Sequence, residues 1–250
     1  MDMWQIFDIT HRYHTFMNPS TSEKLDEMIA LLKLVPGARV LDIACGKAEP
    51  LLRVAEQYHV QATGVDISSY CIKDARAAAA ARPGTAKSKV EFIEMDAAVY
   101  QPEPESMDLS ICLGATWVYQ GLAGTLAALK QCTRPGGLVL VGEIHWLQDP
   151  PEEYLQMSGL TRESCSTHSG NIDIAIEQGL IPLFSIMSTK EDFDRYEWLR
   201  VLAGERYIME HPDDPELGKL KKHVRGGREE YLKYGRDTVG WAMYLFGNPV

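Results

Sequence analysis

Short apolar runs alternate with longer amphipathic stretches between Arg39 and Glu143, and no other feature of the sequence constrains the fold as strongly. Five runs have the length and composition of buried strands: residues 40–43, 61–65, 90–94, 107–113 and 138–142. Three stretches between them have helical spacing: residues 48–58, 68–82 and 121–132. Strands that alternate with helices form parallel sheets covered by helices. The sequence therefore predicts an α/β protein.

The flanking residues extend this prediction. Residues 20–23 offer several N-cap side chains to an amphipathic helix that ends before Pro36. Another helix is expected over residues 171–178. Apolar runs at 180–187 and 239–246 predict a sixth and a seventh strand. The predicted units are an N-terminal lid with the first helix (residues 1–38), an α/β core (39–189), a helical cap inserted between the last two strands (190–236) and the final core strand (237–250).

A cluster of small residues follows the first predicted strand. Asp42 lies in that strand, and Ala44, Cys45 and Gly46 lead from it into the next helix. Small side chains let the backbone approach a ligand closely, and the helix N-terminus directs its free N–H groups at the ligand. A Rossmann-type sheet binds its cofactor at this place.

Carboxylates also follow the next two predicted strands. Asp66 ends the second strand about 20 residues after Gly46, where a carboxylate accepts both ribose hydroxyls of a nucleoside. Asp96 follows the third strand, where a carboxylate accepts the adenine amino group, and Ile67 and Ala97 are placed to sandwich the ring. Three acidic strand ends in register predict an adenosine-containing cofactor.

In these motifs the chain resembles the class I S-adenosylmethionine-dependent methyltransferases of the bacterial small-molecule type. The resemblance covers residues 20–145 and includes the turn at 132–138. Residues 11–14 and 114–117, and Gly142 and Glu143 followed by Trp146, are similar to an uncharacterised bacterial group of such enzymes. The resemblance implies a Rossmann-like, mostly parallel sheet of seven strands with helices on both faces. It also implies S-adenosylmethionine as the cofactor and S-adenosylhomocysteine as its product.

The resemblance assigns roles by position. Asp42 is expected to orient the methionine amino group through the turn, and Gly46 to approach the cofactor closely. Asp66 is expected to hold the ribose and Asp96 the adenine, while Leu113 flanks the methionine part. This chain has Ala44 and Ala48 where the family usually has glycine. Alanine fits a turn position with negative φ, so we expect the turn to tolerate both.

Composition excludes several classes of protein. The formal net charge of −10 argues against a nucleic-acid partner, because phosphate binding needs clustered Lys and Arg. The basic residues between Lys219 and Arg228 have acidic neighbours and predict a solvent-exposed helix face. The five cysteines are widely spaced, without a Cys-x-x-Cys pair, so we expect no metal site. No apolar run approaches the roughly 18 residues of a membrane span and no secretory signal is evident, which predicts a cytoplasmic monomer or homodimer without a membrane partner.

Absent motifs exclude related enzymes. A nicotinamide dehydrogenase is disfavoured because the first strand is not followed by Gly-x-Gly-x-x-Gly and the sequence has no Tyr-x-x-x-Lys. Methyltransferases of nucleobase or glutamine amines carry Asn/Asp-Pro-Pro-aromatic after the fourth strand, where this chain has residues 113–117, Leu-Gly-Ala-Thr-Trp. Two alternatives stay open: a non-catalytic S-adenosylmethionine-binding protein and a cyclopropane-forming lipid enzyme of the same fold.

The acceptor is expected over the carboxyl ends of the strands. Candidate substrate contacts come from the lid, the fourth and fifth strand ends and the cap: Tyr13, Met17, Trp117, Trp146 and Tyr196. The activated methyl group requires alignment, exclusion of water and, for a hydroxyl or amine acceptor, a base. We expect His145 to be that base as it leaves the fifth strand, with a raised pKa from nearby Glu143, and His14 is the next candidate. The sequence predicts direct in-line methyl transfer to a small molecule.

Overall fold

A seven-stranded sheet in the order β3-β2-β1-β4-β5-β7-β6 organises the computed structural model, which describes residues 1–84 and 88–250. The strands are β1 (Arg39–Ile43), β2 (Gln61–Asp66), β3 (Lys89–Glu94), β4 (Met107–Leu113), β5 (Thr133–Trp146), β6 (Ile181–Met187) and β7 (Val239–Gly247). The pairs among β1 to β5 are parallel, and β7 runs antiparallel to both β5 and β6. The predicted mostly parallel α/β sheet is confirmed.

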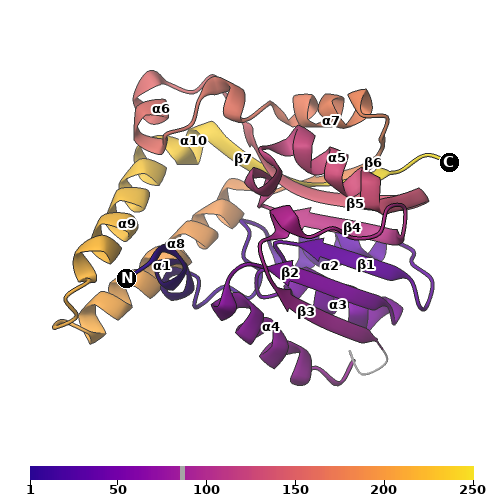
Figure 1. The fold of residues 1–250 in the computed structure, drawn as a ribbon. Helices are drawn as coiled ribbons and strands as arrows, with labels where there is room; N and C mark the ends of the chain where they lie inside the picture. Colours follow the sequence, from indigo (N-terminus) through magenta and orange to yellow (C-terminus); the bar gives the residue numbers. More distant parts are fainter. Residues whose placement is uncertain (85–87) are drawn as a thin grey trace.

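Helices cover both faces of the sheet (Figure 1). They are α1 (Met3–Thr10), α2 (Ser22–Ala30), α3 (Glu49–Tyr58), α4 (Ser69–Ala80), α5 (Leu122–Cys132), α6 (Glu152–Ser158), α7 (His168–Glu177), α8 (Lys190–Glu210), α9 (Leu217–Glu230) and α10 (Arg236–Thr238). Apolar side chains of α2, α3 and α4 fill the core on one face, and those of α5 and α7 fill it on the other. Short 3-10 turns, η2 (Ala97–Val99), η3 (Thr116–Tyr119) and η4 (Arg162–Ser164), join these elements.

Local chemistry sets several element boundaries. The Thr21 and Ser68 side chains cap α2 and α4 by accepting hydrogen bonds from Lys24 N and Cys71 N. The main departure from the predicted boundaries is β5, which runs to Trp146 because β7 pairs with it from Leu138 to Trp146. Glu143 and His145 therefore lie inside a strand.

The helices between β6 and β7 form a separate pair (Figure 1). α8 and α9 pack against each other and against α1 through a cluster that includes Ile6, Val201, Leu220 and Val224. A π-helical turn, η5 (Tyr231–Gly235), then leads through α10 into β7. The chain thus leaves the sheet after the edge strand β6 and returns after the helix pair to form β7 between β5 and β6.

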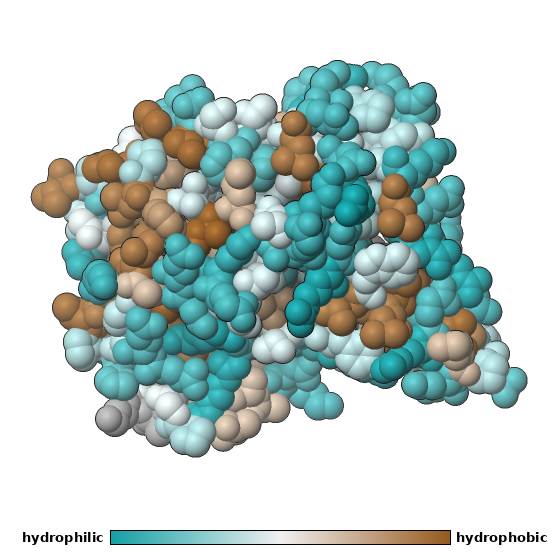
Figure 2. All heavy atoms as spheres, turned by 180° about the vertical axis from the view of Figure 1, so that it is seen from behind, coloured by the Kyte–Doolittle hydropathy of each residue, from teal (hydrophilic) through white to brown (hydrophobic). Residues whose placement is uncertain are grey.

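The β6 side of the sheet is the most apolar part of the rear surface (Figure 2). Ile181, Leu183, Phe184 and Met187 of this edge strand are all exposed. No helix within residues 1–84 and 88–250 is long and apolar enough to cross a lipid bilayer.

Candidate active site

The turn after β1 holds three residues in the left-handed region. Ala44, Gly46 and Ala48 have φ values of 54°, 54° and 59°. The expectation that both alanines have negative φ is wrong, and each bears the cost of about 1–2 kcal/mol that a Cβ meets in this region. Such conformations concentrate at ligand-binding turns. Ala48 also begins α3 without a side-chain capping bond, which leaves this helix N-terminus suited to an anionic group.

Two carboxylates meet at this turn. Asp66 accepts hydrogen bonds from Gly46 N at Oδ2 and from Ser68 N at Oδ1, both at 2.8 Å. Burial raises the pKa of Asp66, against the lowering effect of these two N–H groups. Burial first, and the charge of Asp66 second, raise the pKa of Asp42 well above its ordinary range. Because each carboxylate oxygen has two lone pairs, Asp66 retains capacity to accept from the hydroxyls of a bound ribose.

Asp96 extends the row of carboxylates to the third strand end. Because β1, β2 and β3 are neighbouring parallel strands, Asp42, Asp66 and Asp96 lie in a row at their carboxyl ends. The exposed Asp96 caps η2 by accepting a hydrogen bond from Ala98 N at 2.9 Å. Ile67 is 43% exposed and Ala97 is buried, so an apolar side chain faces solvent beside the carboxylates.

The segment before α2 lies across the turn. Lys47 Nζ donates to His11 O at 3.1 Å, and the sulfur of Met17 lies 3.1 Å from the point where a Cβ on Gly46 would stand. Asn18 Oδ1 fills the corresponding space at Gly114, which follows β4. Residues 11–18 therefore cover the ends of β1 and β4, and a side chain at either glycine would require Met17 or Asn18 to move.

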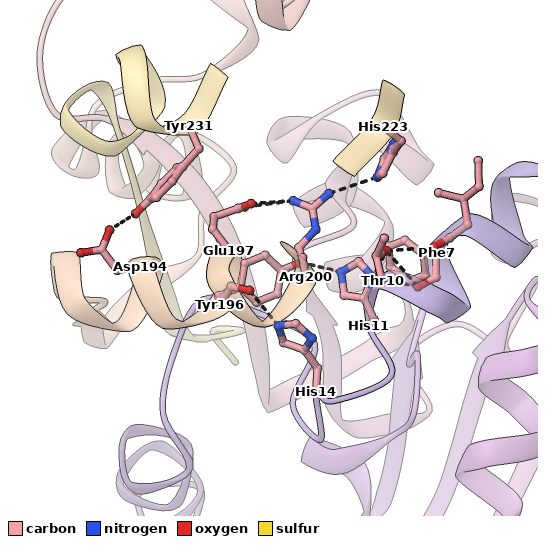
Figure 3. A network of polar contacts seen from close by, with 11 residues as sticks. Phe7, Thr10, His11, His14, Asp194, Tyr196, Glu197, Arg200, His223 and Tyr231 are labelled. Atoms are coloured by element: carbon pink, nitrogen blue, oxygen red, sulfur yellow. Dashed lines mark hydrogen bonds and ion pairs between the residues drawn. The ribbon is translucent and has the colours of Figure 1, made fainter. Parts of the chain in front are cut away.

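Two histidines connect this segment to α8 (Figure 3). Tyr196 OH donates to His11 Nε2 at 2.9 Å, and His14 Nε2 donates to Tyr196 O at 3.0 Å. Burial lowers the pKa of His14 to about 4, so the ring is neutral at pH 7. His14 Nδ1 is buried and has no hydrogen-bond partner in the described part of the chain. His14 Nδ1 is thus an unpartnered lone pair within the segment that covers the turn.

A cavity of about 790 Å³ lies between the sheet and the helices α1, α8 and α9. Ile144, Val239 and Phe193 form its wall toward the sheet, and charged residues of α8 and α9 line the rest: Glu197, Arg200, Lys219, Lys222, His223 and Glu230. Ile144 and Phe193 also pack against the core cluster that contains Cys45 and Leu113. Phe193 also packs edge to face against Tyr196, which contacts His11 and His14, so the cavity wall adjoins the segment that covers the turn.

Glu143 and His145 do not form the predicted pair. Glu143 accepts hydrogen bonds from Thr116 Oγ1 and from Ile144 N, the latter at 2.8 Å, and burial raises its pKa. His145 is buried beside His168, with ring centroids 5.4 Å apart. Burial first and His168 second lower the pKa of His145 to about 4, so the prediction that Glu143 raises this pKa is wrong.

The predicted aromatic contacts lie in different places. Trp117 is 65% exposed on η3, whereas Trp146 is buried and donates through Nε1 to Arg162 O at 2.9 Å. Tyr13 OH accepts a hydrogen bond from Arg206 Nη1 at 3.1 Å. Of these candidates, Met17 belongs to the segment that covers the turn, and Tyr196 forms a hydrogen bond with it. Trp146 packs against Tyr154, which lines the cavity.

The charged residues of the cavity were not found from the sequence. Glu197 and Arg200 lie on one face of α8, but charges at this spacing are also typical of a solvated helix. The basic residues Lys219, Lys222 and Arg225 of α9 are exposed, as predicted, and Lys219 and Lys222 also border the cavity. Arg225 and Arg228 lie outside it and pair with Glu205.

Comparisons with known proteins identify the family. A methyltransferase domain family matches residues 40–137. The uncharacterised protein YjhP of Escherichia coli K12 is 32% identical over 246 residues, which cover 98% of each chain. Its crystal structure has a TM-score of 0.89 with this chain and covers 97% of it and 98% of YjhP.

Two further solved structures contain the demethylated cofactor. A SAM-dependent methyltransferase from Geobacter sulfurreducens in complex with S-adenosylhomocysteine has a TM-score of 0.89 at 31% identity and covers 97% of both chains. One from Thiobacillus denitrificans, in the same kind of complex, has a TM-score of 0.88 at 31% identity and covers 98% of this chain and 99% of the other. With the turn and its carboxylates, these likenesses show that the chain belongs to the S-adenosylmethionine-dependent methyltransferases.

Proposed function

We propose that this methyltransferase acts on a small molecule bound in the cavity between the sheet and α8–α9. The observation that carries the proposal is the cavity itself, whose volume of about 790 Å³ suits a small-molecule ligand. Its wall residue Phe193 packs against Tyr196, which contacts the segment that covers the turn after β1. Residues 190–236 then act as the cap of the acceptor site, residues 1–38 as its lid, and residues 39–189 with 237–250 as the cofactor-binding core.

The cofactor residues in this proposal are those at the strand ends. Asp66 accepts hydrogen bonds from the ribose hydroxyls and Asp96 from the adenine amino group. Gly46 allows close approach of the cofactor, with Asp42 behind it. Ala44, Cys45 and Leu113 flank the methionine part, and Ile67 and Ala97 flank the ring. The free lone pairs of Asp66 and the exposed side chain of Ile67 support this assignment.

The chemistry requires little of the protein beyond alignment. The bound sulfonium supplies an activated methyl group, and the chain aligns the acceptor atom in line with it and excludes water. Met17 and the other residues of the covering segment are placed for the second task.

Proton removal, where the acceptor needs it, is assigned to His14. Its Nε2 proton is held by Tyr196 O, which leaves the unpartnered Nδ1 as the basic atom in the segment that covers the turn; His145 Nδ1 is likewise unpartnered among the residues described. His145 lies within β5 against His168, which supports a packing role for it. Glu143 has its carboxylate engaged by Thr116 and Ile144 N and is assigned to positioning η3.

Label transfer tests the proposal. The protein is incubated with methyl-tritiated S-adenosylmethionine and a filtered metabolite extract, and label is counted separately in small-molecule, protein and nucleic-acid fractions. We expect label in the small-molecule fraction. Gly227→Leu should lower it by about tenfold or more, because the side chain fills the cavity that Gly227 lines without a steric clash of its Cβ. His14→Gln should lower it by about two decades for a hydroxyl or amine acceptor.

The matched control is Gly218→Leu. Gly218 lies in the same helix with open space around it and is outside the cavity lining, so this variant should transfer label as the wild type does. S-adenosylhomocysteine binding, measured by calorimetry, should be equal in all variants. Label found only in protein or nucleic acid, or equal transfer by Gly227→Leu and wild type, contradicts the proposal.

A further inference from the structure

Most positive charges of the cavity have partners in the protein, although Arg200 Nε is buried without a hydrogen-bond partner among the described residues. Arg200 Nη1 donates to both carboxylate oxygens of Glu197, at 3.0 and 2.9 Å, and Arg200 Nη2 contacts His223 Nε2 at 3.3 Å (Figure 3). Burial and the charge of Arg200 lower the pKa of His223, so that ring is neutral at pH 7. Lys219 donates to Met1 O at 3.2 Å and lies 3.5 Å from Glu216. Lys222, which has no such partner in the described ranges, is exposed.

Glu230 is a half-buried acidic residue of the cavity whose carboxylate pairs with no other side chain in the described part of the protein. Within residues 1–84 and 88–250 no protein group forms a hydrogen bond or an ion pair with its carboxylate, which is only half buried. Burial, and then the charge of Glu197, raise its pKa, while Arg200 lowers it. Burial first, and the charge of Glu230 second, raise the pKa of Tyr154, and both side chains line the cavity. A half-buried carboxylate that no protein group engages is available to pair with a charged group of a ligand.

The surroundings of Glu230 suit an organic cation. Tyr154, Phe193 and Tyr231 line the same cavity, and Phe193 and Tyr231 stack with centroids 5.7 Å apart. Aromatic rings beside a carboxylate are the side chains that bind alkylammonium groups. The apolar wall at Ile144, Leu160 and Val239 is available for a hydrocarbon body.

We propose that the acceptor is a cationic amine with an apolar body, and that its ammonium group pairs with Glu230 among the aromatic rings of Tyr154, Phe193 and Tyr231. The inference rests on the proposed function in one respect, namely that the cavity is the acceptor site. It concerns recognition of the acceptor and leaves the identity of the methylated atom to the label-transfer product.

The test compares three probes that differ only in their head group. Hexylamine, hexanol and hexanoate are titrated calorimetrically into protein saturated with S-adenosylhomocysteine. We expect hexylamine to bind about tenfold or more tightly than the other two, the effect of one charge-assisted contact. Glu230→Gln should remove this preference and leave hexanol binding unchanged. Glu229→Gln is the matched control, because Glu229 is exposed, adjacent in sequence and outside the cavity lining.

Gly227→Leu locates the bound amine. Loss of hexylamine binding in this variant, with Gly218→Leu unaffected, places the amine in the cavity. The inference is overturned if the three probes bind equally, if hexanoate is preferred, or if hexylamine does not bind measurably. It is also overturned if the preference for the amine survives Glu230→Gln or Gly227→Leu. Each of these results is compatible with label transfer to a small molecule, so failure of this inference is distinguishable from failure of the proposed function.

Discussion

Two alanines in the turn after β1 hold a backbone conformation that ordinarily belongs to glycine. Ala44 and Ala48 lie in the left-handed region on either side of Gly46. The sequence identifies this turn through the strand before it and the helix after it, but it does not reveal the sign of φ. That sign follows from how the chain turns from β1 into α3, which is a property of the packed structure.

Ala48→Gly should therefore stabilise the protein. Removing the Cβ relieves a cost of about 1–2 kcal/mol, and the greater freedom of glycine in the unfolded chain offsets about 0.4–1 kcal/mol of this gain. Urea unfolding measures the difference. The control Ala77→Gly, at an exposed position inside α4, should destabilise by about 1 kcal/mol. A loss of stability in Ala48→Gly as large as in Ala77→Gly would show that the left-handed conformation carries no strain.

Other residues of the site differ in how far the sequence predicts them. Asp42, Asp66 and Asp96 were predicted as a row because parallel strands end at one edge and the strand periodicity is clear. The contact between His14 and Tyr196 joins residues 182 positions apart, and no local pattern indicates it. The same holds for Glu230, whose neighbours come from separate helices.

At the scale of elements, the sequence predicted most strands and helices but misjudged the end of β5. The apolar run ends near Gly142, whereas pairing with β7 continues to Trp146. Long-range pairing, which the apolar pattern of one strand does not encode, therefore placed His145 inside the sheet. The packing of α8 on α9 depends on a similar long-range contact, because a Cβ on Gly204 would overlap the side chain of Val224.

Gly204→Ala should therefore destabilise the helix pair. Overpacking costs about 1–3 kcal/mol, and the better helix propensity of alanine recovers up to about 1 kcal/mol. Urea unfolding should show a net loss, and Val224→Ala in the same chain should reverse part of it, as a double-mutant cycle measures. Gly218→Ala, which meets nothing within 4 Å, should be neutral or stabilising by up to about 1 kcal/mol. Equal effects of Gly204→Ala and Gly218→Ala would contradict the close approach of α8 and α9.

At the scale of the whole molecule, burial acts on histidines and carboxylates in opposite directions. His14 and His145 have pKa values lowered to about 4 by burial, while burial raises those of Asp42, Asp66 and Glu143. Below about pH 6.5 these histidines bind protons in the unfolded chain but not in the folded chain. His14 and His145 therefore destabilise the fold in acid. The carboxylates take up protons in the folded state and oppose this trend. The pH dependence of total stability thus sums two effects, and single variants are needed to separate them.

His145→Asn isolates the histidine effect. The contribution of the neutral, buried His145 to the free energy of unfolding is fully present above about pH 6.5 and is lost as the pH falls toward 4. At pH 5 the loss is about 2 kcal/mol. The wild type should therefore lose more stability than the variant between pH 7 and pH 5, as urea unfolding at the two pH values measures. The exposed His211, replaced in the same way, should leave the wild-type pH dependence unchanged. Parallel curves for wild type and His145→Asn would mean that the ring accepts a proton in the folded state, which would return His145 to consideration as the base in place of His14.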